Sequence, residues 1–202
     1  MTNFDMTLMY AMHNALRREL EHLAKATARE DDDPRRVLAA AAGWELFKIS
    51  LHAHHTAEDE ALWPVLRETL ADRPDDLALL DAMEAEHAAI DPLIEAIDTG
   101  TEPMGELVDA LATNLTTHLA HEEKEALPLM DVTLTLEQFQ HFGQVHAVRV
   151  GPNGPRVFPW LLDGADGATE AALLAVLPAP ARAAFEAEWQ PAYKALTRWP
   201  TH

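Results

Sequence analysis

Two histidine–glutamate pairs with the same spacing are the residues of this chain best suited to chemistry. His54 precedes Glu58 by four residues, and His118 precedes Glu122 by four residues. Residues four apart on an α-helix lie on one face, about 6 Å apart along the axis, so each pair can bind a single metal site. The chain has no cysteine, so imidazole and carboxylate are the available ligands, a set that suits iron, manganese or zinc.

An internal repeat adds two more histidines to these pairs. At an offset of 64 residues the two pairs coincide, and Pro64 coincides with Pro128. At an offset of 74 residues, His13 coincides with His87, each on a stripe of apolar residues at helical spacing. Each half of the repeat therefore reads as a helix with one inward histidine, followed by a helix with His-x-x-x-Glu. The predicted metal ligands are His13, His54, Glu58, His87, His118 and Glu122.

The register of these ligands has competitors nearby in the sequence. Two other pairs have the same spacing, His55 with Asp59 and His121 with Glu125. They lie at unequal distances from the two matched prolines, whereas Glu58 and Glu122 lie at equal distances, so the first register is preferred. The remaining histidines are expected at the surface or outside the ligand shell: His22, His52, His55, His121, His141 and His146.

A different di-metal pattern, Glu-x-x-His on two helices, also occurs in the chain. It is formed by Glu19 with His22 and by Glu84 with His87. His22 falls off the apolar stripe of its helix, and this pattern leaves three of the predicted histidine ligands unexplained. The symmetric set is therefore the preferred prediction. A single histidine on an apolar face is usually an ordinary core residue, but four in matched positions favour a metal site.

The elements that must position these residues are helices. Apolar residues at helical spacing predict four helices, over about residues 5–29, 33–70, 73–100 and 102–130, with a proline-containing start at Asp33 and a glycine stop at Gly100. The short connections predict an all-α, up-down-up-down four-helix bundle over residues 1–131.

Residues 132–202 are predicted to form a helical C-terminal extension. A helix begins at Thr135, where Gln138 completes a capping box, residues 151–155 form a loop, and a last helix carries an apolar stripe. The extension either packs on the bundle or makes a homodimer contact. The stripe consists of Phe185, Trp189, Tyr193 and Leu196.

Composition excludes some partners. A net charge of −19 repels phosphate backbones, which argues against nucleic-acid binding. No apolar run approaches the roughly 20 residues of a membrane-spanning helix, and the N-terminus lacks the features of a signal peptide. These observations predict a cytoplasmic protein without a membrane partner.

Four sequence strings resemble those of the hemerythrin family, in particular the bacterial HHE-type domains. They are MHNALRREL with His13, HHTAEDEALWP, EAEHAAIDPL with His87, and HLAHEEKEALP, and the resemblance covers about residues 5–130. It implies two non-haem iron ions with an oxo, hydroxo or water bridge, and O2, peroxide or nitric oxide as ligand. It further implies that the four predicted histidines are terminal ligands and that Glu58 and Glu122 bridge the irons.

The chain departs from the oxygen carriers of that family at one position. Those proteins resemble this chain but have a second histidine four residues after the first on the third helix, where this chain has Asp91 followed by Pro92. The absent imidazole argues against simple O2 carriage, because roughly four of twelve coordination positions would stay open. Asp91 is either a further ligand or a capping group, and Tyr10 either approaches the irons or is a core residue.

Three functions follow from the resemblance and the departure. The first is a di-iron protein that binds or reacts with O2, peroxide or nitric oxide, as a sensor, store or scavenger. The alternative is a di-iron oxidoreductase, an oxidase, oxygenase or peroxide-consuming enzyme acting on a small molecule. The third is a metal-free or zinc-bound helical module whose partner docks on the extension.

Overall fold

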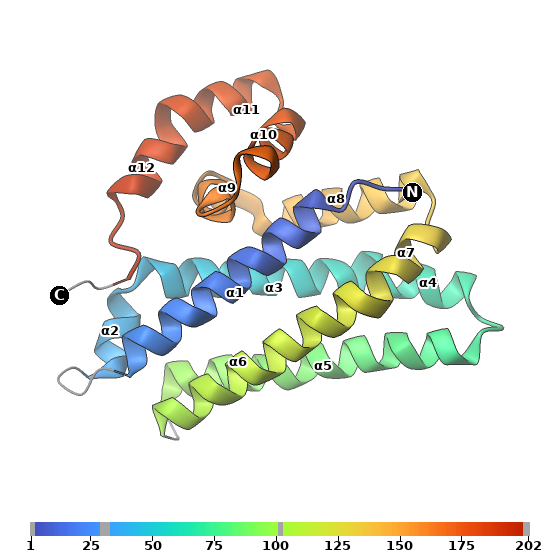
Figure 1. The fold of residues 1–202 in the computed structure, drawn as a ribbon, viewed down its shortest axis with the longest axis horizontal. Helices are drawn as coiled ribbons and strands as arrows, with labels where there is room; N and C mark the ends of the chain where they lie inside the picture. Colours follow the sequence, from blue (N-terminus) through green and yellow to red (C-terminus); the bar gives the residue numbers. More distant parts are fainter. Residues whose placement is uncertain (1–2, 29–32, 101–102, 200–202) are drawn as a thin grey trace. The chain divides into compact units, whose positions relative to one another are not determined.

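The computed structural model describes residues 3–28, 33–100 and 103–199, and within these ranges the chain is helical and contains no strand, as predicted for an all-α protein (Figure 1). The helical segments in chain order are α1 (Thr7–Thr27), α2 (Pro34–Ala40), α3 (Ala42–Ala61), α4 (Trp63–Thr69), α5 (Pro74–Thr99), α6 (Met104–His121), η1 (Glu122–Ala126), α7 (Leu127–Thr133), α8 (Leu136–Val150), η2 (Gly151–Asn153), α9 (Gly154–Leu162), α10 (Gly167–Val176), α11 (Ala179–Ala184), η3 (Phe185–Trp189) and α12 (Gln190–Ala195).

Local signals explain several of these boundaries. The Asp33 side chain accepts a hydrogen bond from the Arg35 amide at 3.1 Å and caps α2, whose first residue is a proline. Gly100 ends α5 in the left-handed conformation, with φ of 68°. The predicted capping box is present at α8, where the Thr135 amide donates to Gln138 Oε1 at 2.8 Å and the Gln138 amide donates back to Thr135 Oγ1 at 3.2 Å.

Two predicted elements are wrong. The single helix expected over residues 33–70 is three helices, interrupted at Ala41, where ψ is 105°, and at Leu62, two residues before Pro64. The loop expected over residues 151–155 is instead the 3-10 turn η2 running directly into α9. Its prolines occupy the first turns of these segments, where their missing N–H groups cost nothing.

The chain divides into two compact units. One contains Leu51–Arg149 with the first described residues of the chain, and the other contains Asp5–Ser50 and the chain from Val150 onward. The boundary falls within α3.

In the unit of Leu51–Arg149, α5 and α6 lie side by side as an antiparallel pair joined by a short connection (Figure 1). Helix α4 contacts both α5 and α7. The Asp131 side chain accepts hydrogen bonds from the amides of Asn3 and Phe4, at 2.7 and 2.9 Å, and the Phe4 ring stacks on Phe139 of α8. The first residues and the first helix of the predicted extension therefore belong to the same packed core.

In the other unit, α1 packs against α2, α9 and α10. Arg18 of α1 donates to the Trp160 carbonyl at 3.0 Å, and the Trp199 indole donates to the buried Glu19 carboxylate at 2.7 Å. A Cβ atom on Gly43 would lie 2.4 Å from the Trp199 ring, so only glycine fits at this contact. The later part of the predicted extension is therefore bound to the early helices of its own unit by partly buried polar contacts.

None of the helices in the described ranges combines the length and the apolar character that crossing a membrane requires.

Candidate metal centre

Six polar side chains are buried together in the core of the unit of Leu51–Arg149. They come from α3, α5, α6 and the turn η1, and each is at most 5% exposed. Burying this many polar groups costs several kcal/mol for each group that lacks a compensating partner, roughly 2–7 kcal/mol on transfer scales. The six residues are His54, His55, Glu58, His87, His118 and Glu122.

The two His-x-x-x-Glu pairs lie as helical spacing predicts. On α3, His54 Nε2 is 3.3 Å from Glu58 Oε1, and at the end of α6, His118 Nε2 is 3.9 Å from Glu122 Oε2. The glutamate of the competing pair, Glu125, is 44% exposed on its side chain. Helical periodicity alone therefore turns one imidazole and one carboxylate of each pair into the core.

Glu122 begins a π-helical turn, η1, in an otherwise α-helical segment. Pro128 follows this turn and lacks the N–H that would bond to the carbonyl four residues earlier, so the chain needs a local change in helical register. Single π-helical turns of this kind are common at functional sites, because they shift one side chain relative to its neighbours. The turn thus sets the direction of the Glu122 carboxylate.

The outer ring nitrogen, Nδ1, of both His87 and His118 is hydrogen-bonded to a carboxylate on a neighbouring helix. His87 Nδ1 is 2.8 Å from Asp59 Oδ1, and His118 Nδ1 is 2.9 Å from Glu86 Oε2. An ionised carboxylate can only accept a hydrogen bond, so both Nδ1 atoms carry the hydrogen. A carboxylate acceptor on one ring nitrogen orients the ring and makes the other nitrogen a better metal ligand.

The inner nitrogens of these two histidines face each other. His87 Nε2 and His118 Nε2 are 3.1 Å apart, and in the neutral rings both carry lone pairs, which repel. Burial first, and then His87, lower the pKa of His118 and so favour its neutral form. Two nitrogens bound at about 2.1 Å and at right angles to one cation would be about 3.0 Å apart. The observed separation therefore fits two ligands of one metal ion.

Glu58 lies between imidazoles and a second acid. Its two oxygens are 3.3 Å from His54 Nε2 and 3.5 Å from His87 Nε2, and neither receives a hydrogen bond from a described residue. Burial, followed by the charge of Glu122, raises the pKa of the Glu58 carboxyl well above its ordinary value. Two ionised carboxylates in a dry core are costly unless a cation lies between them. These observations, with the nitrogen and oxygen donor set, fit a metal such as iron.

The structure places the other predicted residues as follows. His13 is buried on α1, in the other unit. Tyr10 is 43% exposed, so it is not the core residue that was one of its two predicted roles. Asp91 is exposed on α5, and α5 continues through Pro92.

The Glu-x-x-His pattern is not assembled by the described residues. Glu19 is bonded to Arg18 and Trp199, and Glu84 forms an ion pair with Arg67 at 2.5 Å. Both glutamates therefore have cationic or indole partners, which a metal ligand would have to give up.

Of the two places predicted for His55, the surface and a position outside the ligand shell, the structure excludes the surface. The residue is buried, and its ring nitrogens lie with those of His87 and His118 in a group whose ligand atoms are all within 4.8 Å of one another. Its matched residue at the offset of 64 is Leu119, a fully buried position. The repeat therefore held the signal that His55 points inward. His146 on α8 is also shielded, and this burial lowers the pKa of its imidazole. The centroids of the His146 and His54 rings are 6.2 Å apart.

Asp59 and Glu86 are functional residues that sequence reasoning missed. The sequence pairs Asp59 with His55 on its own helix, whereas in the structure its carboxylate faces His87 Nδ1 on α5. Glu86 Oε1 also accepts from His121 Nδ1 at 2.8 Å, so one carboxylate holds two imidazoles. Spacing along one helix gives no signal for such contacts, because they depend on how neighbouring helices pair.

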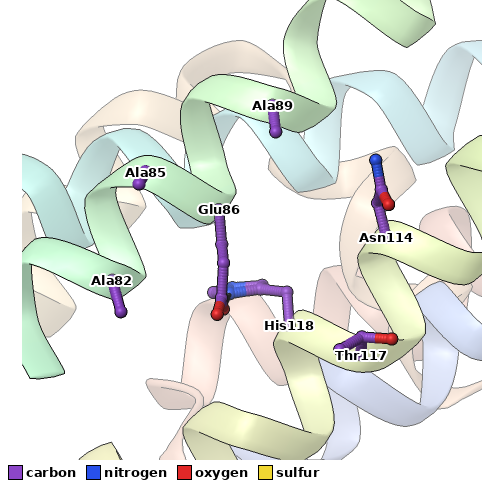
Figure 2. A pocket seen from close by; sticks show the side chains of 7 residues that line it. All are labelled: Ala82, Ala85, Glu86, Ala89, Asn114, Thr117 and His118. Atoms are coloured by element: carbon purple, nitrogen blue, oxygen red, sulfur yellow. Dashed lines mark hydrogen bonds and ion pairs between the residues drawn. The ribbon is translucent and has the colours of Figure 1, made fainter.

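A cavity of about 350 Å³ opens between α5 and α6 on the outer side of His118 (Figure 2). Alanines line its α5 side, and the Glu86 side chain reaches across to the His118 ring at its floor. The lining residues are Ala82, Ala85, Glu86, Ala89, Asn114, Thr117 and His118.

Comparison with known proteins bears on this cluster. The family model described as the hemerythrin HHE cation-binding domain matches residues 6–130, which contain the whole cluster. No curated protein and no solved structure matches the chain.

Proposed function

Because the chain belongs to the hemerythrin family with its HHE cation-binding domain, we propose that its buried histidine–glutamate cluster holds two non-haem iron ions that bind or react with O2, peroxide or nitric oxide. The observation that carries the proposal is the pair of inner nitrogens of His87 and His118, which face each other at 3.1 Å while carboxylates occupy both outer nitrogens. A cation accounts for this arrangement, whereas packing alone does not.

Each residue of the cluster has a part in the proposal. His54, His87 and His118 would be terminal ligands, and Glu58 and Glu122 would bridge the two ions. His13 joins them on the strength of the sequence repeat, in which it matches His87. The same donors would also accept manganese or zinc, so the metal has to be measured.

When bound, two ferrous ions would together supply two electrons to a small oxidant, one from each ion. The protein's residues do the rest. Asp59 and Glu86 hold the Nδ1 hydrogens of His87 and His118 and thereby fix both rings. The fully buried Trp63 ring lies 6.2 Å from the His87 ring, and Met83 and Leu115, one turn before His87 and His118, are fully buried as well, which favours exclusion of bulk water.

The cavity beside His118 favours the alternative function, a di-iron oxidoreductase acting on a small molecule. Its α5 side is lined by alanines, and it also exposes a carboxylate, Glu86, that is bonded to a predicted ligand. A substrate bound there would be separated from the cluster by one imidazole ring.

The test begins with metal analysis of the purified protein and with reconstitution under anaerobic conditions using ferrous iron. The proposal expects two iron ions per chain and, after oxidation, the near-ultraviolet absorption of a bridged ferric pair. A protein that takes up neither iron nor another transition metal would contradict it.

Kinetics then separate the two functions. A reduced protein that takes up one equivalent of O2 or nitric oxide and releases it intact is a sensor or store. Repeated consumption of peroxide, or of O2 with an organic substrate, identifies an oxidoreductase. Loss of that turnover when Ala85 is enlarged to Leu, with iron content unchanged, would assign the cavity to the substrate.

A further inference from the structure

His55 is the one buried imidazole of the cluster that the repeat does not explain. Its matched residue is Leu119, and both positions lie in the core, so the two halves of the repeat differ here in chemistry but not in burial. A leucine is sufficient to fill such a position. The histidine therefore needs a reason other than packing, because a buried imidazole costs more than a leucine.

The surroundings of His55 supply that reason. Its ring stacks on His87, with ring centroids 3.9 Å apart and an interplanar angle of 6°, and it meets the His118 ring edge-on at 5.1 Å. One nitrogen from each of the three rings falls within a group no wider than 4.8 Å. Three imidazoles from three different helices, α3, α5 and α6, therefore converge on one point.

Helix α5 contributes only one imidazole to this point. The residue one turn after His87 is Asp91, which is exposed, and Ala88 and Ala89 offer no ligand atom. If one metal position is to have three imidazoles, the third must come from another helix. Among the described residues, His55 is the histidine grouped with both His87 and His118.

We propose that His55 is a metal ligand, the third imidazole beside His87 and His118 at one of the two metal positions; this rests on the function proposed above. The donor set then rises from the six predicted ligands to seven. Roughly three of twelve coordination positions stay open instead of four, and the two metal positions become unequal. Three neutral imidazoles add no negative charge to the metal position. The positive charge of the divalent ion therefore remains available to balance the carboxylates of Glu58 and Glu122.

The test compares metal binding by the full-length wild type and two variants. His55→Leu restores the residue found at the matched position of the other half, and so keeps the site apolar and filled. His52→Leu changes an exposed histidine on the same helix and serves as the matched control. Metal-free protein is titrated with Co²⁺, followed by visible absorption and calorimetry, and iron per chain is measured after anaerobic loading.

The expected result is selective. Wild type and His52→Leu bind two ions. His55→Leu keeps one site of unchanged affinity, and its affinity at the other site falls by about 10- to 100-fold. Two sites of wild-type affinity in His55→Leu would overturn the proposal. If wild type itself binds no metal, the proposed function fails and the role of His55 fails with it, whereas two unchanged sites in His55→Leu overturn the role of His55 alone.

A second measurement guards against misfolding of the variant. Circular dichroism and thermal unfolding of metal-free His55→Leu show whether it folds. If it does not, wild-type protein labelled with ¹⁵N-histidine is titrated with Zn²⁺, and the ring nitrogens are followed by nuclear magnetic resonance. A metal-induced shift of a His55 ring nitrogen together with those of His87 and His118 supports the proposal, and a His55 ring that does not shift overturns it.

Discussion

The α3 segment around His54 and Glu58 and the α6–η1 segment around His118 and Glu122 carry the same motif, yet the backbone treats them differently. Both are followed at the same distance by a proline. After the first motif the helix breaks at Leu62 and restarts as α4, whereas at the second it continues through the π-helical turn η1. Next to the motif, one segment has His55 where the other has Leu119. The repeat thus conveys the ligand pattern, and the residues between ligands make the two sides unequal.

A large effect that would test this comparison is expected at Glu58. With metal at about 100 times its dissociation constant, wild type should gain roughly 3 kcal/mol in free energy of unfolding. Glu58→Gln should lose this gain, because the amide cannot replace the bridging carboxylate. The metal-free variant should be at least as stable as metal-free wild type, because the buried acid is removed.

Thermal unfolding with and without ferrous iron measures both effects. Glu68→Gln, which changes an exposed acid of the same unit, is the control. An undiminished metal-induced stabilisation in Glu58→Gln would refute the bridging role.

A second prediction concerns Leu119→His, which gives the α6 segment the histidine of the α3 segment. His55→Leu makes the two segments alike in the reverse way, by giving the α3 segment the leucine. Leu119→His places an imidazole at a fully buried position that the predicted ligand set does not use. The loss of apolar packing and the burial of a polar group should destabilise the protein by about 2–4 kcal/mol. Urea unfolding measures this cost, with metal analysis alongside. A stable variant that binds an additional ion would show that the two sides are equivalent after all.

Third, the carboxylates outside the cluster should tune its affinity. Asp59→Ala and Glu86→Ala each remove the acceptor of a histidine Nδ1, and each should weaken metal binding about 10- to 100-fold. Glu86→Ala should have the greater effect, because Glu86 also accepts from His121. Calorimetric titration with Co²⁺ gives the affinities, and Glu84→Ala is the control on the same helix. Equal affinity in all three variants would mean that the ring orientation is set by packing.

The smallest effects are expected at the two prolines. Pro128→Ala supplies an N–H group and should let η1 relax toward α-helix, which turns Glu122 away from its present direction and weakens metal binding. Pro64→Ala lies beyond a helix that has already ended, so metal affinity should not change. Both substitutions should alter the free energy of unfolding by no more than about 1 kcal/mol. Titration of both variants with the same metal decides whether the two prolines differ.

Sequence reasoning succeeded where a signal and its consequence are close together in the chain. The capping box of Thr135 and Gln138 and the glycine stop at Gly100 need only a few neighbouring residues. The burial of His54, Glu58, His118 and Glu122 follows from helical periodicity in the same way.

It failed where the cause lies on a distant segment. The break at Ala41 accompanies a hydrogen bond from the Gly43 amide to the Arg198 carbonyl, 2.8 Å long, and nothing near residue 41 announces it. The acceptor roles of Asp59 and Glu86 likewise depend on which helices become neighbours. His55 is a different case, since its match to the buried Leu119 indicates an inward side chain, whereas the sequence prediction left the surface and a position outside the ligand shell both open.

The carboxylate of Glu86 spans two environments, and this affects how charge can be balanced around the cluster. One oxygen meets His118, whose side chain is completely shielded, and the other meets His121, whose side chain is 29% exposed. On the opposite side, the Asp59 carboxylate that holds His87 is itself 44% exposed. The rings of His87 and His118 are thus shielded from bulk solvent. Each is nevertheless connected to it through one or two hydrogen bonds, by way of a partly exposed carboxylate. If the cluster holds iron as proposed, a change in its charge could be compensated by hydrogen ions moving along these chains, without opening the core.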